Sequence, residues 1–225
     1  MVNGNVLAPG VTIGYHRDLP GGWGDVLLAH KSQVFAVEDN ISDDMAVLVE
    51  PLAIAMHAVL GIRSNPQAPV MVLGSGTIAL ATIWALRAQG HKGLILSQVK
   101  RPHERVLAKK MGATEVVFPG DAANEALLKT GATAYKPIIG DEVFAGGGFS
   151  VVYDCVGNAQ SLAQAMNFAS PRGKIAAIGC VGKIRDIDLT MLWARELRVH
   201  GFVGYGLEEW AVSYTHLTLP TNREV

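Results

Sequence analysis

The regular alternation of short apolar runs with helix-like segments is the feature that most constrains this chain. Six runs suited to buried strands follow residue 69, at residues 70–73, 93–96, 115–118, 150–153, 174–178 and 197–203. The segments that suit helices lie between them, at residues 77–88, 102–111, 121–129 and 161–169. Runs that are apolar on both faces are typical of parallel strands covered by helices on both sides. The pattern predicts an α/β fold with a doubly wound, Rossmann-type parallel sheet.

A glycine-rich turn between the first expected strand and helix carries the clearest chemistry. Its residues match the pattern G-x-G-x-x-G/A, as Gly74-Ser75-Gly76-Thr77-Ile78-Ala79. Gly74 permits the tight turn, Gly76 leaves room for a pyrophosphate, and Ala79 lets the helix pack closely on the strand. The N–H groups of Thr77 and Ile78 would point at the phosphates from the positive end of the helix. We interpret the turn as a dinucleotide-binding site, and a glycine turn without a ligand is the alternative.

The end of the second expected strand indicates which dinucleotide is bound. An NAD site usually has Asp or Glu about 20 residues beyond the glycine turn, where the carboxylate accepts a hydrogen bond from the ribose 2′-hydroxyl. Residues 96–101 contain no acid. Ser97 is polar but neutral, while Lys100 and Arg101 could bind a 2′-phosphate through charge-assisted hydrogen bonds. The sequence therefore favours NADP over NAD, unless the two cations are an ordinary solvated pair before a helix.

Two short segments follow later strands, at the edge of the sheet where such folds bind ligands. They are Asp154-Cys155-Val156-Gly157 and Gly179-Cys180. We expect Cys155, Val156, Gly157 and Gly179 beside the cofactor. For the cysteine side chains themselves, a buried packing role is favoured over catalysis.

Several segments, taken in order, resemble one family, the medium-chain zinc-containing alcohol dehydrogenases. The resemblance covers roughly residues 7–210 and is carried by Gly21-Gly22-Trp23-Gly24, residues 48–53 with His57-Ala58, the glycine turn, and residues 108–114, 152–157, 172–174 and 196–201. It implies a GroES-like, β-rich catalytic domain followed by a Rossmann domain. It also implies hydride transfer between NAD(P) and an alcohol or carbonyl compound, with zinc as a second cofactor.

The chain departs from that family at the metal. Only the ligand of the Glu-Pro-Leu motif has a counterpart here, Glu50. The Cys and His ligands, often found with a Gly-His-Glu motif, and the structural-zinc cysteines have none. A catalytic zinc needs three protein ligands, so we expect a fragment that cannot complete the site alone. A solvated carboxylate favoured by the helix dipole is the alternative for Glu50, and His57, on the same helix face, is expected to be a core histidine.

The resemblance and the composition together suggest three segments. Residues 1–62 are expected to be part of the GroES-like catalytic domain, and residues 63–212 the NAD(P)-binding Rossmann domain. Residues 213–225 resemble a translated sequencing adapter, and we hypothesise that this tail is not native. Residues 131–148, rich in glycine, are expected to form a flexible surface connection.

Composition excludes some functions. A net charge of −1 with 49% hydrophobic residues argues against disorder and against nucleic acid as a partner. Two cysteines make no disulfide framework and no secretory signal is visible, so the cytoplasm is expected. Residues 64–86 lack charge over a length that could span a membrane, but Pro66 and the glycine turn divide them into a strand and a helix. We therefore expect no membrane partner.

Three functions remain open at this stage. The first is a zinc-dependent, NADP-preferring dehydrogenase of small alcohols or polyols, with association of two copies through residues 197–203 as a family-level expectation. The second is a zinc-free quinone or enone reductase, which Glu50 mildly disfavours because such a site has no use for that carboxylate. The third is a non-catalytic module that senses the NADP ratio.

Overall fold

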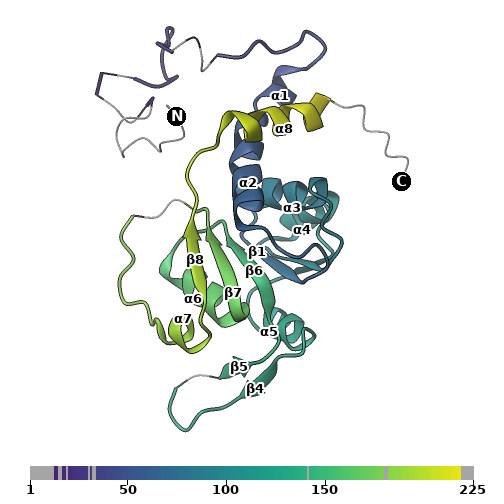
Figure 1. Ribbon diagram of the computed structural model, residues 1–225, viewed down its shortest axis with the longest axis vertical. Helices are drawn as coiled ribbons and strands as arrows, with labels where there is room; N and C mark the ends of the chain where they lie inside the picture. The colour runs from purple at the N-terminus through teal and green to yellow at the C-terminus, as the bar shows by residue number, and fades with distance from the viewer. Residues whose placement is uncertain are drawn as a thin grey trace.

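The structure, a computed structural model, describes residues 13–14, 17–18, 20–29, 31, 34–140, 142–179 and 182–218. Its centre is a six-stranded sheet with helices on both faces (Figure 1). This arrangement confirms the predicted doubly wound α/β fold.

The sheet is parallel at every pair of neighbouring strands, in the order β3-β2-β1-β6-β7-β8. The strands are β1 (Val70–Leu73), β2 (Ile95–Gln98), β3 (Glu115–Val117), β6 (Phe149–Asp154), β7 (Ala169–Ala177) and β8 (Arg198–Gly201). All six predicted strands are present, although β2 begins two residues later than expected and β7 begins five residues earlier. The chain leaves β1 toward β2 on one side, and β6 lies on the other side of β1. A ligand-binding crevice forms at such a point in doubly wound sheets, outside the carboxyl ends of the strands.

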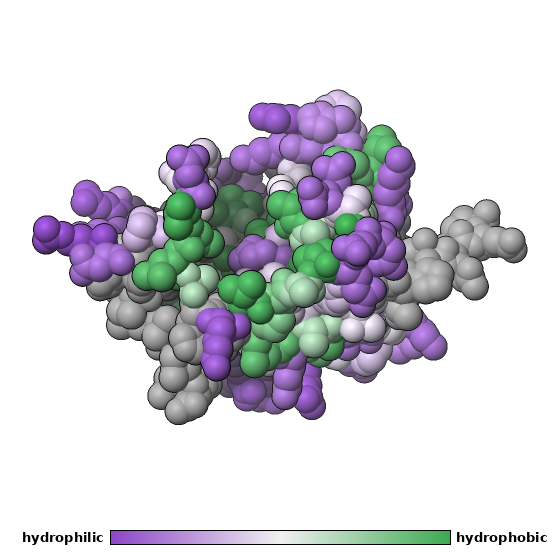
Figure 2. Space-filling model, turned by 90° about the horizontal axis from the view of Figure 1, so that it is seen from above, coloured by the Kyte–Doolittle hydropathy of each residue, from purple (hydrophilic) through white to green (hydrophobic). Residues whose placement is uncertain are grey.

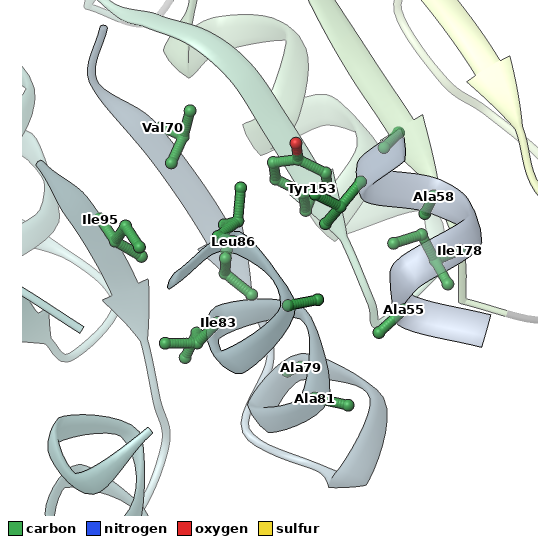
Figure 3. Close-up of a cluster of buried hydrophobic side chains, with 14 of the residues drawn as sticks. Ala55, Ala58, Val70, Ala79, Ala81, Ile83, Leu86, Ile95, Tyr153 and Ile178 are labelled. Carbon is green, nitrogen blue, oxygen red and sulfur yellow. The ribbon is translucent and has the colours of Figure 1, made fainter. Parts of the chain in front are cut away.

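Helices cover the two faces of the sheet unequally. On one face, α2 (Val49–Ile62), α3 (Thr77–Ala88) and α4 (Pro102–Lys110) bury a cluster that includes Val70, Ile95 and Tyr153 (Figure 3). On the other face, α5 (Asp121–Leu128) and α6 (Ala159–Phe168) bury a second cluster around Met71, Leu96 and Ile175. Because every residue of β1 is buried, its continuous apolar run is explained by cover on both faces.

Membrane-like hydropathy has a simple structural origin here. The uncharged stretch 64–86 contains β1, the glycine turn and most of α3, as expected. A second segment, Asp43–Ile62, is long and apolar enough to cross a membrane by length and composition alone. It comprises α1 (Asp43–Ala46) and α2, and α2 packs against α3 and α8 (Leu207–Thr218) with Ala53, Met56 and Ala58 fully buried. In this fold α2 is thus a core helix.

Two expectations about loops differ from the structure. Residues 131–148 contain an antiparallel hairpin of β4 (Thr133–Tyr135) and β5 (Val143–Ala145), where a flexible connection was expected. The hairpin is anchored because Phe144 is buried and lies edge-on to Phe168, with ring centroids 6.5 Å apart. In addition, the described residues before Asp43 contain no strand, although that region was expected to be β-rich. No strand of the described chain pairs with this region, so its backbone lacks the hydrogen bonds to a neighbouring strand that a β-strand needs.

The last helix crosses the expected start of the tail. Helix α8 continues through residue 213 without a break in secondary structure. Ser213 is fully buried, and His216 lies edge-on to Trp84 with ring centroids 5.6 Å apart. The first residues of the tail are therefore part of the packed fold, and the hypothesis that the tail is not native stays a prediction. The remaining helix, α7 (Thr190–Ala194), connects β7 to β8.

Candidate functional site

The two glycines of the turn after β1 meet different surroundings. Gly74 has φ of +113°, and a Cβ added there would lie 3.2 Å from Val156 Cγ2 and 3.6 Å from the Cβ atoms of Ala79 and Cys155. Gly74 is therefore required by both backbone conformation and packing. Gly76 has an ordinary φ of −77°, and an added Cβ would meet nothing within 4 Å. The space in front of Gly76 is open.

That open space faces the start of α3. Gly76 is the N-cap residue of this helix, and no side chain caps it. The first N–H groups of a helix have no partner inside it, and they carry the positive end of the helix dipole. Thr77 is exposed and Ile78 half-buried, while Ala79 is buried against the sheet as predicted. An anion in front of Gly76 would therefore meet free donors of the right polarity.

A buried carboxylate shapes the neighbouring turn at the end of β6. Asp154 is 1% exposed and accepts hydrogen bonds from Val156 N at 3.0 Å, Gly157 N at 2.9 Å and Ser161 Oγ at 2.9 Å. Gly157 is held at a φ of +70°. Because three donors satisfy the carboxylate, Asp154 is a structural residue that fixes the turn at Cys155–Gly157.

Gly179, at the end of β7, packs directly against this turn. A Cβ added to Gly179 would lie 2.5 Å from Val156 C and 2.6 Å from Gly157 N. The structure thus brings Gly74, Gly179 and the turn at Cys155–Gly157 together at the carboxyl ends of β1, β6 and β7. These residues were predicted from separate motifs, and they share one place in the fold.

Cys155 is a packing residue within that group. Its Sγ lies 3.6 Å from Thr82 Oγ1, and burial raises the pKa of the thiol to about 12. A thiol with such a pKa is protonated at neutral pH, whereas the thiolate is the nucleophilic form. Cys180 lies outside the described residues.

The end of β2 presents two exposed cations and an unexpected carboxylate. Lys100 and Arg101 are exposed, and their backbone N–H groups donate to Glu104 Oε2 at 2.9 and 2.8 Å. The hydrogen bond from Ser75 and those from the two N–H groups hold the pKa of the Glu104 carboxyl below its usual value. Ser75 belongs to the glycine turn, so Glu104 connects that turn to the end of β2. Sequence reasoning missed Glu104, although its place three residues after Arg101, with Pro102 between, is typical of a helix start.

Ser97 is not brought to this site. Its side chain is fully buried in β2, where the residue lies between Val72 and Val116 on the neighbouring strands. Alternate side chains of a strand point to opposite faces, and Ser97 shares the face of Ile95 and Val99, which pack in the α3 cluster. Its hydroxyl has no hydrogen-bond partner in the part of the chain that the structure describes. A ligand at the surface could reach it only by displacing packed side chains.

Glu50 lies in the first turn of α2, on an exposed part of the helix. Partial burial raises the pKa of its carboxyl, and its charge adds to the burial that raises the pKa of Tyr205. No group of three His, Cys, Asp or Glu side chains suited to a metal occurs among the described residues. Glu50 is therefore not part of a zinc site that these residues could complete.

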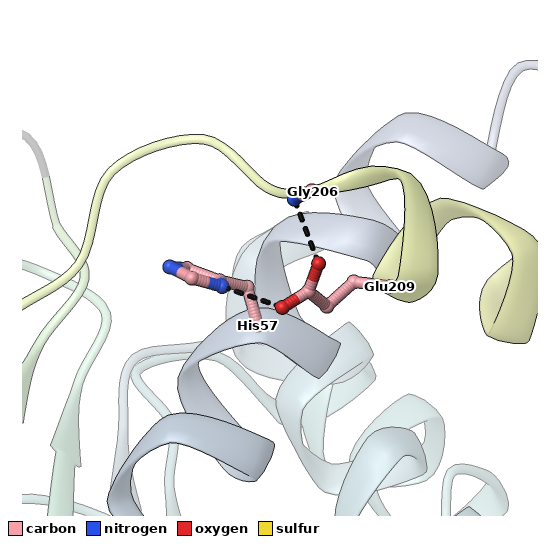
Figure 4. Close-up of polar contacts among 3 residues, drawn as sticks. All are labelled: His57, Gly206 and Glu209. Atoms are coloured by element: carbon pink, nitrogen blue, oxygen red, sulfur yellow. Dashed lines mark hydrogen bonds and ion pairs between the residues drawn. The ribbon is translucent and has the colours of Figure 1, made fainter. Parts of the chain in front are cut away.

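His57, two turns further along α2, has a different partner. Its Nδ1 lies 2.9 Å from Glu209 Oε1, and the other carboxylate oxygen of Glu209 accepts from Gly206 N at 2.7 Å (Figure 4). The ring of His57 is edge-on to Phe202, with centroids 5.7 Å apart. The pair joins α2 to α8, a structural contact that the sequence did not reveal.

The end of the molecule that carries α1 and α8 also exposes apolar surface. Figure 2 looks down on this end, where apolar side chains gather near the middle of the face and polar side chains surround them. Exposed apolar residues in or near α1, α2 and α8 include Met45, Val47, Leu48, Val203 and Leu207.

Known proteins share this fold and sequence pattern. The family model described as "Zinc-binding dehydrogenase" matches residues 77–217. L-idonate 5-dehydrogenase of Vitis vinifera is 28% identical over 182 residues, which are 79% of this chain and 46% of that protein. The chain spans about half the length of the curated relatives it matches.

Two solved structures extend the comparison. L-idonate 5-dehydrogenase of Escherichia coli superposes with a TM-score of 0.73 at 21% identity, covering 88% of this chain and 53% of that one, which shows the fold. A structure from Sinorhizobium meliloti, ascribed to the zinc-binding dehydrogenases and bound to NADP, has a TM-score of 0.62 at 25% identity, covering 81% and 52%. Since the family model spans more than half of its 225 residues, this chain belongs to the zinc-binding dehydrogenase family.

Proposed function

We propose that this chain is the nicotinamide-dinucleotide-binding part of an oxidoreductase. The reaction would transfer a hydride between the cofactor and the carbon of a small alcohol or carbonyl compound. The observation that carries the proposal is the open space at Gly76 in front of the uncapped start of α3. Family membership supports it, because the relatives are named as dehydrogenases.

The residues of the site suit a dinucleotide. The pyrophosphate would lie against Gly76 and accept hydrogen bonds from the N–H groups of Thr77 and Ile78. Gly74, Gly179 and the turn at Cys155–Gly157 would contact the part of the cofactor beyond the pyrophosphate. When bound, the nicotinamide ring supplies the hydride acceptor or donor, and the protein contributes binding and orientation.

For the choice of dinucleotide, Lys100 and Arg101 support NADP. Both are exposed at the end of β2, and cations at this place suit a 2′-phosphate. The NADP-bound relative adds support.

Zinc does not fit the described residues alone. Glu50 has no second and third ligand beside it in the part of the chain that is described, so we derive no step through a metal. Zinc dependence of the whole protein is proposed from the family alone. Association of two copies through β8 is likewise a proposal, supported by its position at the edge of the sheet and its exposed residues.

A turnover assay on the complete gene product tests this function. We expect at least one member of a panel of polyols and secondary alcohols to reduce the nicotinamide. The increase in absorbance of the reduced cofactor measures this reaction. Activity that survives full removal of metal would favour the zinc-free reductase instead. Cofactor binding without turnover on alcohols, carbonyl compounds, quinones or enones would contradict the enzymatic proposal and favour a sensing module.

A further inference from the structure

One carboxylate lies where the glycine turn meets the end of β2. Glu104 accepts hydrogen bonds from the backbone N–H groups of Lys100 and Arg101 at 2.9 and 2.8 Å. The side chain of Ser75 in the glycine turn is the largest influence that lowers the pKa of the Glu104 carboxyl. Glu104 belongs to α4, the helix that follows β2.

This junction is where a dinucleotide presents its adenosine ribose in a doubly wound fold. An acid near the end of the second strand accepts the 2′-hydroxyl of NAD, whereas cations there receive the 2′-phosphate of NADP. The end of β2 has no acid of its own, and Val99 there is buried. Glu104 brings a carboxylate to the same junction from α4, beside the two cations.

The carboxylate also occupies the donors that a phosphate would use. The N–H groups of Lys100 and Arg101 precede α4 and would suit an anion. Both already donate to Glu104, so a 2′-phosphate would have to displace a negative charge or lie close to it. The side chains of Lys100 and Arg101 act in the opposite direction, because they attract the phosphate.

We propose that Glu104 sets the cofactor selectivity of this site: it accepts the ribose hydroxyl of NAD and repels the 2′-phosphate of NADP, in opposition to Lys100 and Arg101. The inference rests on the proposed function, since it needs a dinucleotide at the glycine turn. It predicts that the preference for NADP in this chain is weaker than its two cations alone would produce.

A purely structural role for Glu104 is the competing explanation. A Glu three residues into a helix commonly accepts the N–H of the N-cap residue, and a Gln does the same. The substitution Glu104→Gln therefore keeps an acceptor for the helix start and removes only the charge. A structural role predicts no change in the ratio of the two affinities, whereas a selectivity role predicts a large one.

The test is an equilibrium titration of the 225-residue chain with NADH and with NADPH, followed by the fluorescence of the reduced nicotinamide. Three proteins are compared: the unaltered chain, Glu104→Gln, and the charge-matched control Glu115→Gln, at the amino end of β3. Circular dichroism and urea unfolding establish that each variant is folded. For Glu104→Gln we expect NADPH to bind about tenfold more tightly, the scale of one removed like charge at a partly exposed site, and NADH to bind several-fold more weakly.

The outcomes separate the two proposals. A shift in the affinity ratio toward NADPH in Glu104→Gln, with the ratio of Glu115→Gln unchanged, supports the selectivity role. Binding of both cofactors with the same ratio in all three proteins overturns that role and leaves the dinucleotide site intact. Failure of the folded, unaltered chain to bind either cofactor contradicts the dinucleotide site and the inference with it.

Discussion

The two glycines of the glycine turn, Gly74 and Gly76, have different structural surroundings. Gly74 is confined by its positive φ and by the side chain of Val156, so the fold requires it. Gly76 has an ordinary backbone conformation and empty space where a Cβ would lie, so nothing in the protein alone requires glycine there. Under the proposed function, the close approach of a ligand to the backbone would account for the second glycine.

Asp154 is the residue on which the turn beside Gly74 depends. Replacing it with Asn would remove the charge that the N–H groups of Val156 and Gly157 face, and would put an NH2 group where the hydroxyl of Ser161 now donates. We expect Asp154→Asn to lower the free energy of unfolding by about 2–3 kcal/mol, the cost of a buried polar mismatch. The matched control is Asp188→Asn, because the exposed carboxylate of Asp188 accepts hydrogen bonds from Thr190 N and Oγ1. We expect this substitution to lower the free energy of unfolding by less than about 1 kcal/mol. If urea unfolding showed that both substitutions lower the free energy of unfolding equally, the burial of Asp154 would not contribute to its effect on stability.

Particular residues show how far sequence reasoning reached at this scale. The grouping of the glycine turn, Cys155–Gly157 and Gly179 could be predicted because glycine spacing and strand ends are local signals. Ser97 was expected beside the cofactor, whereas its side chain is buried in β2. A strand buried on both faces has no alternation in its sequence to indicate which way a side chain points. The link between Glu104 and the glycine turn was missed because it depends on Ser75, which is distant in the sequence.

At the scale of elements, the packing of α8 on α2 lay beyond local sequence signals. The helices α3, α4, α5 and α6 were predicted within two residues at each end, because residues such as Pro102, Gly112 and Asp121 mark several of their starts and stops. The contact between α2 and α8 joins segments about 150 residues apart, and periodicity gives no information on such pairs. The hairpin of β4 and β5 was not predicted, because the glycines and the proline around it are typical of a loop.

The contact between Glu209 and His57 makes part of the stability depend on pH. Burial acts to raise the pKa of Glu209, but hydrogen bonds from His57 and from backbone N–H groups outweigh it, and the pKa is lowered from 4.5. A lowered pKa in the folded state means that the carboxylate stabilises the fold above the unfolded value and loses this effect as the pH falls through the folded value.

We therefore expect Glu209→Gln to be less stable than the unaltered chain by under about 1 kcal/mol near pH 5.5, with the difference shrinking as the pH is lowered toward about 3. Urea unfolding at a series of pH values measures this. The control is Glu208→Gln, a neighbouring exposed carboxylate. A difference between Glu209→Gln and the unaltered chain that grows on acidification would contradict the assignment.

The last residues of α8 allow a test of its packing. A chain that ends at residue 212 lacks the buried Ser213 and the ring contact of His216 with Trp84. We expect its thermal midpoint to fall by several degrees relative to a chain ending at Thr218, as a loss of about 1–2 kcal/mol implies. Identical midpoints would mean that residues 213–218 add nothing to the fold.

At the scale of the whole molecule, the residues of the proposed dinucleotide site lie together, whereas Glu50 lies apart from other candidate metal ligands. The carboxyl ends of β1, β2, β6 and β7 supply the residues that suit a dinucleotide. Glu50 lies on the exposed start of α2, without other candidate ligands among the described residues. Cofactor binding and metal binding are therefore expected to be separable in this chain.

This separation predicts that chelators leave cofactor binding unchanged. We expect the affinity of the chain for NADPH and its thermal midpoint to be the same before and after dialysis against EDTA, within measurement error. As a control, zinc is added back in equimolar amount, and the affinity for NADPH and the thermal midpoint are measured again. A loss of affinity after chelation that zinc restores would reveal a metal site that the described residues do not form.

The central claim is that the space at Gly76 receives the pyrophosphate of a nicotinamide dinucleotide, and one comparison tests it most directly. NADPH is titrated against the unaltered chain and against Gly76→Ala, and the urea unfolding of both is measured. The added methyl group meets nothing within 4 Å in the protein alone, and the cost of Ala at the N-cap of α3 is offset by the lower entropy of the unfolded chain. The account therefore predicts unfolding free energies within about 1 kcal/mol of each other. It also predicts an affinity at least about tenfold weaker for Gly76→Ala, from a clash with the cofactor. Equal affinity in two equally stable proteins would contradict the account.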